Sequence, residues 1–180
     1  MLRTFENVSR FVAGTVGEPG ARSFWIQVRS GNDLVSVAAE KSQVSLLGER
    51  FEEMLREIRL AHPEIERPGL IEDREGLEMP VIGDFRVGAI AIFFDEYIEK
   101  VQVDLREVNN DFDEEELFEI DTASLDNVQV LRIYLSLAQV KSFAVTAQAL
   151  VKAGRLPCPF CAFPIDPLGH ICARANGYRR

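Results

Sequence analysis

The stretch RFVAGTVGEPGARSFWIQVRSGNDLVSVAAE, residues 10–40, decides the first half of the fold. Its short apolar runs alternate with turn residues, a pattern typical of antiparallel strands joined by tight turns. Successive side chains of a strand point to opposite faces, so Phe24, Ile26 and Val28 share one face of the middle run. The stretch predicts a three-stranded antiparallel meander whose middle strand carries Trp25 on the opposite, wetter face.

Two amphipathic helices are predicted further along the chain. In SQVSLLGERFEEMLREIRLAHP, apolar residues recur at steps of three or four, with Ser42 as the expected N-cap and Pro63 just beyond the end. The second helix, SLAQVKSFAVTAQALVKAG, opens with Ser136 and Gln139 at capping-box spacing and closes at Gly154. The apolar stripe of the first helix consists of Val44, Leu47, Phe51, Leu55 and Ile58.

A second set of strands lies between the two helices. DFRVGAIAIFF and EKVQVDLREV read as an antiparallel hairpin, and NVQVLRIYLS reads as a further strand. Residues 63–83, which hold three prolines, three glycines and six acidic side chains, are expected to form a linker that crosses the surface. The predicted fold class is α+β: an antiparallel sheet covered by two helices over residues 1–154, followed by a small zinc-binding module over residues 155–180.

Composition and charge narrow the classes of function. With 180 residues and 47% hydrophobic side chains, the chain is suited to one globular domain with a small appendage. The stretch MLRTFENVSRFVAG contains no apolar core of signal-peptide length, and no uninterrupted apolar run approaches the roughly 20 residues that span a bilayer. We therefore expect a soluble, cytoplasmic protein without a membrane partner.

The net charge of −9 is unevenly distributed. The last 30 residues hold five basic side chains and one acidic one, so the preceding 150 residues are more acidic than the total suggests. Nucleic-acid binding depends on neutralising phosphates with basic side chains. If the chain contacts nucleic acid, we expect the contact at the tail only.

The segment CPFCAFPIDPLGHIC, residues 158–172, contains all three cysteines and one of the two histidines. The two-residue gap between Cys158 and Cys161 lets a tight turn direct both thiolates to one point, as in a zinc knuckle. His170 and Cys172 are one residue apart, so on an extended segment both side chains face the same way. The spacing predicts one structural zinc ion with four protein ligands. Since catalytic zinc keeps one position open, a closed site argues against chemistry at the metal.

Other interpretations of the thiols and histidines remain open. The thiols could be buried and inert, or Cys158 and Cys161 could form a redox pair, although such a pair is expected at a strand-to-helix junction. His62 and Glu64, together with PCPFC, satisfy the letters of the zinc deaminase signature. His62, however, lies at a predicted helix end rather than at a helix start.

Two weaker motifs have simpler interpretations. GTVGEPG lacks the following helix N-terminus and the Lys-Ser/Thr pair of a phosphate-binding loop, so a hairpin turn is expected there. The acidic run within residues 111–116 lacks the glycine and terminal glutamate of an EF-hand loop. We interpret it as a solvated charge run.

The chain resembles a family of uncharacterised actinobacterial proteins of about this length, which carries a domain-of-unknown-function label. The resemblance rests on RFVAGTVGEPGARSFWIQ and EKSQVSLLGER near the start and on CPFC, GHIC and NGYRR at the end. It implies that the cysteine and histidine tail is a family feature, with Ala162 where relatives more often have glycine. It implies nothing about a substrate.

Three functions from different classes follow from these features. The favoured one is a non-catalytic, zinc-stabilised adaptor that binds another protein through the tail and the Trp25 face. The alternatives are an enzyme whose site lies in the body, and a nucleic-acid contact through the basic tail. The candidate partner contacts are Arg174, Tyr178, Arg179, Arg180 and Trp25.

Overall fold

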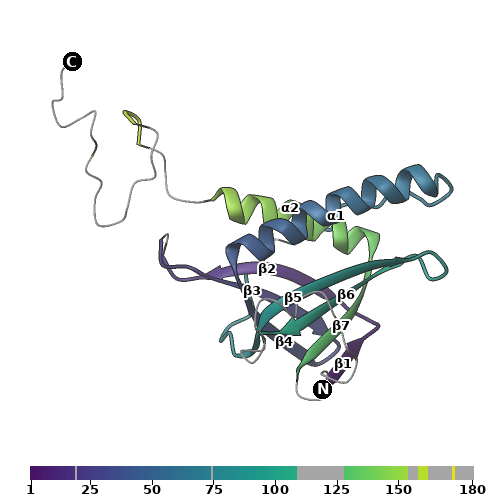
Figure 1. Ribbon diagram of the computed structural model, residues 1–180, viewed down its shortest axis with the longest axis horizontal. Helices are drawn as coiled ribbons and strands as arrows, with labels where there is room; N and C mark the ends of the chain where they lie inside the picture. Colours follow the sequence, from purple (N-terminus) through teal and green to yellow (C-terminus); the bar gives the residue numbers. More distant parts are fainter. Residues whose placement is uncertain (19, 74, 109–127, 154–157, 162–171, 173–180) are drawn as a thin grey trace, which may run out of the picture.

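The computed structural model describes residues 1–18, 20–73, 75–108, 128–153, 158–161 and 172. Within these residues the chain forms a mixed sheet of seven strands and two helices, which confirms the α+β class (Figure 1). In chain order the elements are β1 (Leu2–Phe5), β2 (Arg10–Val16), β3 (Ser23–Ser30), β4 (Asp33–Ala39), α1 (Lys41–Ala61), β5 (Gly83–Asp95), β6 (Lys100–Glu107), β7 (Val130–Ser136) and α2 (Leu137–Lys152).

The strands follow the order β1-β7-β6-β5-β4-β3-β2 across the sheet. The meander β2-β3-β4 and the hairpin β5-β6 are antiparallel, as predicted. The sheet as a whole is mixed rather than antiparallel, because β4 pairs with β5 and β1 pairs with β7 in parallel. A parallel pair requires a long crossover connection, and α1 with the segment that follows it is that connection between β4 and β5.

Strand β1 was not predicted from the sequence. It is only four residues long and none of its side chains is fully buried, so it carries little hydrophobic pattern. Its register is set by tertiary pairing, with Leu2 opposite Val130 and Phe5 opposite Ile133. Residues 6–9 then join β1 to β2, the strand at the other end of the sheet order.

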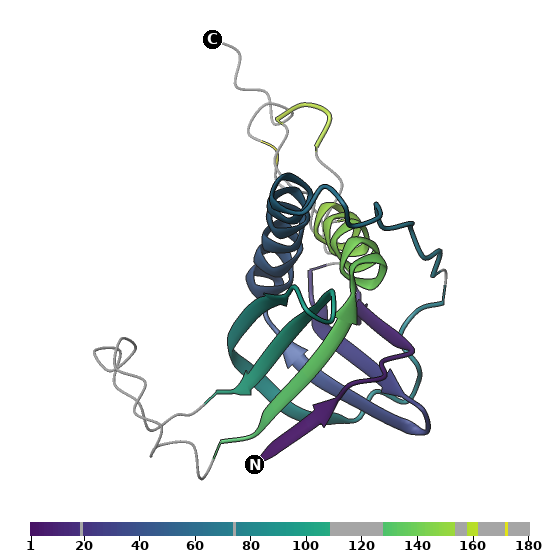
Figure 2. The same ribbon diagram turned by 90° about the vertical axis from the view of Figure 1, so that its right-hand side faces the viewer.

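Both helices cover the same face of the sheet and lie side by side on it (Figures 1 and 2). The predicted core face of β3 is confirmed, since Ile26 and Val28 are fully buried. Phe143 of α2 stacks on Phe11 of β2, with ring centroids 4.7 Å apart, and meets Phe51 of α1 edge-on at 5.6 Å. Aromatic contacts therefore join the sheet and both helices in one core.

The two helices also approach each other closely at a glycine. A Cβ placed on Gly48 of α1 would lie 3.0 Å from the Cβ of Ala147 on α2, tighter than ordinary van der Waals contact. Glycine in a helix interior costs about 1 kcal/mol relative to alanine, so its presence here is explained by the close packing it allows.

The helix starts were predicted with mixed success. α2 begins as expected: the backbone N–H of Gln139 donates to the Ser136 hydroxyl at 3.3 Å, and the Gln139 side chain accepts from Ser136 N. Ser42 as the N-cap of α1 was wrong. The cap is Glu40, whose backbone N–H donates to the Gln43 side chain at 2.8 Å, as in a capping box. The N-cap of α1 therefore lies two residues before the predicted one.

Residues 75–82, which we call the strap, cross the sheet face that points away from the helices, as the linker prediction expected. Gln27 fixes the strap: its side chain accepts from Glu78 N at 2.8 Å and donates to Glu78 O at 3.0 Å. Arg10 binds Asp73 through two hydrogen bonds of 2.6 and 3.0 Å. Leu77 lies so close to Gly14 that a side chain at Gly14 would collide with it. The strap therefore covers the part of the outer face of the meander around Gly14 and Gln27.

In the part of the chain that the structure describes, neither α1 nor α2 combines the length and the apolar character needed to cross a bilayer.

Candidate metal centre

Cys158 and Cys161 lie on either side of a turn that includes Pro159 and Phe160. The backbone N–H groups of Phe160 and Cys161 donate to the Cys158 sulfur, which is the arrangement that the two-residue gap predicts. These two hydrogen bonds, aided by contacts with the Cys161 and Cys172 thiols, lower the pKa of Cys158 to about 6, although burial opposes the shift. The turn thus favours the thiolate, the form of cysteine that binds metals.

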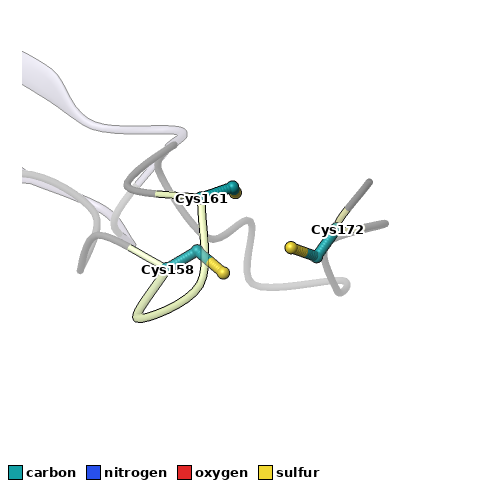
Figure 3. Close-up of side chains that lie close together, drawn as sticks. All are labelled: Cys158, Cys161 and Cys172. Atoms are coloured by element: carbon teal, nitrogen blue, oxygen red, sulfur yellow. The ribbon is translucent and has the colours of Figure 1, made fainter. Parts of the chain in front are cut away.

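Cys172 is remote in sequence from this turn, yet its side chain is directed toward those of Cys158 and Cys161 (Figure 3). The three sulfur atoms lie within 4.8 Å of one another. Tetrahedral zinc with Zn–S bonds of about 2.3 Å holds its sulfur ligands about 3.8 Å apart, so small side-chain movements would bring these three atoms into ligating positions. Cys158 and Cys172 are each only 5% exposed.

Among the described residues, these thiols are the one group of three or more cysteine, histidine or acidic side chains close enough to share an ion. None of the three cysteines forms a disulfide. Three sulfur donors suit soft or borderline metals such as zinc rather than magnesium or calcium, which take oxygen ligands. The described residues therefore offer three ligands for one ion. His170, the predicted fourth ligand, lies outside the described residues.

Of the five predicted partner contacts, only Trp25 lies within the described residues. Arg174, Tyr178, Arg179 and Arg180 lie outside the described residues. Trp25 is half-buried on the outer face of β3, where its indole Nε1 donates to the Ser23 hydroxyl at 3.0 Å.

The ring of Trp25 also packs against the start of β5. A Cβ at Gly83 would come within 2.9 Å of the ring, so the absence of a side chain there makes room for the indole. The chain thus covers part of the Trp25 face itself.

His62 is not grouped with the thiols. It caps the C-terminal end of α1, its Nδ1 lies 3.3 Å from Glu64 Oε1, and its ring meets Phe94 edge-on at 5.9 Å. The arrangement required by the deaminase signature, with the histidine at a helix start beside the metal, is not formed. The glycine-rich stretch is also a turn, as expected, with Gly17 and Gly20 at positive φ between β2 and β3.

The sequence did not single out a groove between α1 and α2. It has a volume of about 410 Å³ and is lined by apolar and basic side chains. Arg56 and Arg59, one turn apart on α1, were the signal available in the sequence, but isolated basic pairs on a helix surface are too common to indicate a site.

Comparison with known protein families gives a match over most of the chain. A family described as "Protein of unknown function (DUF3090)" matches residues 3–172, a range that contains both helices and all three cysteines. No curated protein and no solved structure matches the chain. The resemblance to a domain of unknown function is thus confirmed, whereas an actinobacterial origin stays a prediction. The match covers nearly the whole chain, which therefore belongs to the DUF3090 family.

Proposed function

We propose that the protein binds one structural Zn²⁺ through Cys158, Cys161, His170 and Cys172, and that the metal-stabilised C-terminal module is a non-catalytic adaptor for another protein. The observation that carries the metal assignment is the convergence of three sulfur atoms within 4.8 Å. This cluster combines Cys158 and Cys161, on either side of one turn, with Cys172, eleven positions after Cys161.

The chemistry of the donor set favours zinc over the alternatives. Iron–sulfur clusters are held in most cases by four cysteines, one more than this chain contains. Three thiolates and one neutral imidazole are a common ligand set of structural zinc sites. A site with four protein ligands leaves no position for water or substrate, which supports a structural rather than a catalytic ion.

The adaptor role is supported by the charge distribution. A zinc module without a core of its own supplies a rigid platform, and the basic residues after Cys172 are suited to an acidic protein surface. In a reducing cytoplasm, the localisation proposed here, the thiols would remain available for the metal. The Trp25 face is the second proposed contact.

The experiment that tests the metal site compares the two histidines of the chain. Metal content is measured by mass spectrometry on purified full-length protein, on His170→Asn and Cys172→Ser, and on His62→Asn as the matched control. We expect about one zinc per chain in the parent and in His62→Asn, and a large loss in the other two variants. Equal zinc in His170→Asn and the parent would remove His170 from the ligand set. Absence of metal under reducing, chelator-free conditions would overturn the assignment and turn attention to redox chemistry.

A second experiment tests the adaptor role with the metal kept in place. Arg179→Ala/Arg180→Ala is expected to retain zinc and to lose the partner proteins captured by the parent chain. Binding of a fluorescent oligonucleotide at low salt, weakened by the same double variant, would instead support the nucleic-acid alternative. Capture that is unchanged by the double variant would show that these two arginines are not the contact.

A further inference from the structure

A groove of about 410 Å³ lies between α1 and α2, beside the segment that leaves α1 (Figure 2 shows the two helices side by side). Its floor is apolar: Ile58 and Ala144 are buried, and Val145 is 47% exposed on one wall. Leu55 and Ile65 are half-buried and also line it. The volume falls within the range of about 300–1,000 Å³ that is typical of small-molecule sites.

Basic side chains from three segments surround this floor. Arg56 and Arg59 come from α1, Arg67 from the segment after α1, and Lys141 from α2. Lys141 is held in place by the hydrogen bond that its Nζ donates to Pro68 O at 2.9 Å. The cations therefore approach one space from several directions, as in a binding site, rather than lying along one helix face.

Arg56, Arg59 and Arg67 differ from most described arginines of this protein in having no acidic partner. Within the described part of the chain, only four arginine side chains make no hydrogen bond or ion pair, and three of them line the groove. Most other described arginines bind a carboxylate, as Arg10 binds Asp73 and Arg132 binds Asp104. In a chain with 29 acidic residues, arginines left without an acidic partner are available to an anion from outside.

The charge balance of the groove is opposite to that of the protein. Two carboxylates line it, Glu52 and Glu66, and Glu52 accepts a hydrogen bond of 2.6 Å from Gln148. Four basic side chains thus face two acidic ones, although the chain as a whole carries −9. An excess of two positive charges over an apolar floor complements a dianion with an apolar body.

We propose that this groove binds a small phosphate monoester with an apolar chain, its phosphate among Arg56, Arg59 and Arg67 and its chain over Ile58 and Ala144. A phosphate monoester carries a charge of about −1.5 to −2 at neutral pH. Its oxygens match the planar donor fork of arginine, and a monocarboxylate would leave part of the positive charge unbalanced. The proposal is independent of the zinc site and of the adaptor role.

The test uses full-length, zinc-replete protein and isothermal titration calorimetry with three probes. Octyl phosphate carries both parts of the proposed ligand, inorganic phosphate only the charge, and 1-octanol only the chain. Octyl phosphate is expected to bind at least about tenfold more tightly than either of the others, because each part contributes free energy of its own.

Variants then locate the binding. Arg56→Gln/Arg59→Gln is expected to weaken octyl phosphate binding by about tenfold or more, whereas Arg50→Gln, an arginine of the same helix paired with Glu53, is expected to leave it unchanged. Val145→Asp, at the exposed wall, is expected to weaken it as well. Circular dichroism and zinc content check that each variant is folded.

Three outcomes would overturn the proposal. Octyl phosphate binding that is absent, or equal in Arg56→Gln/Arg59→Gln and Arg50→Gln, would show that the groove does not bind the phosphate. Dimerisation that Val145→Asp abolishes would assign the groove to a second copy of the chain. Binding of a poly-glutamate peptide, lost in the double arginine variant and unaccompanied by octyl phosphate binding, would assign it to an acidic protein segment.

Discussion

The core beneath α1 and α2 and the thiol cluster at Cys158, Cys161 and Cys172 differ in the interaction that stabilises their folded structure. In the core, Phe143 contacts aromatic rings from β2 and α1, and burial of apolar surface supplies the stabilisation. At the cluster, a four-residue turn and one distant cysteine come together around sulfur atoms. A segment too short to bury a core needs another source of free energy, and in comparable peptides zinc supplies on the order of 10 kcal/mol.

Removal of the metal is expected to have the largest effect of the changes considered, and to affect the thiol cluster without unfolding the core. A strong chelator should release the zinc and make all three thiols reactive toward a disulfide reagent, while the thermal midpoint of the body changes by only a few degrees. Thiol titration and calorimetry on the same sample measure both. If the thermal midpoint falls in step with zinc release, the two regions are not independent.

Truncation of a core side chain is expected to lower the stability of the body and to leave the zinc content unchanged. Phe143 is 1% exposed, so Phe143→Ala should lower the free energy of unfolding by about 3–5 kcal/mol, measured by urea titration. Phe93→Ala, at a side chain 61% exposed on β5, is the matched control and should cost less than about 1 kcal/mol. Zinc content should remain at the parental value in both. Loss of zinc in folded Phe143→Ala would contradict the separation.

Loss of a strap contact is expected to lower stability less than truncation of the core, because hydrogen bonds rather than apolar contacts hold the strap on the sheet. Gln27 is 1% exposed and satisfies both backbone groups of Glu78, so Gln27→Ala leaves them unpaired and should cost about 1–3 kcal/mol. Urea unfolding measures the loss. Gln129→Ala is the control, since its side chain makes no hydrogen bond in the described structure. Equal stability of the two variants would mean that water replaces Gln27 at little cost.

The smallest expected effect is the response to acid of Asp73, which lies just before the strap and binds Arg10. The hydrogen bonds from Arg10 hold the pKa of Asp73 below its ordinary value. A carboxyl whose pKa is lower in the folded state stabilises the fold at neutral pH, and this contribution disappears as the pH falls below about 4 and through the folded pKa.

Asp73→Asn should therefore be less stable than the parent at pH 7 by up to about 1 kcal/mol, with the difference shrinking at pH 3. Urea midpoints at both pH values measure it. A difference that stays constant between the two pH values would show that the charge of Asp73 contributes nothing.

Local signals were enough to predict most of the elements. The alternation around Ile26 predicted β3 and its core face, and the spacing of Ser136 and Gln139 predicted the start of α2. The turn between Cys158 and Cys161 followed from the gap between them. In each case the determining interactions lie within a few residues, where hydrophobic period and capping chemistry act directly.

Features that depend on distant pairing could not be predicted. β1 exists because β7 provides its partner, and the parallel pairing of β4 with β5 depends on the path of α1 and the strap. The groove between the helices likewise combines Arg59, Arg67 and Lys141 only after the chain has folded. The convergence of Cys172 with the turn was expected from metal chemistry, and the full ligand set remains a prediction because His170 lies outside the described residues.

The parallel pairing of β1 with β7 has a consequence for synthesis on the ribosome. Leu2 is synthesised long before its partner Val130, which follows on the order of ten seconds later at ordinary translation rates. During that interval the meander can form, while the N-terminal segment has no strand to pair with. The residues of β1 thus pair long after they have been synthesised, and a nascent-chain chaperone would meet them as a free β edge.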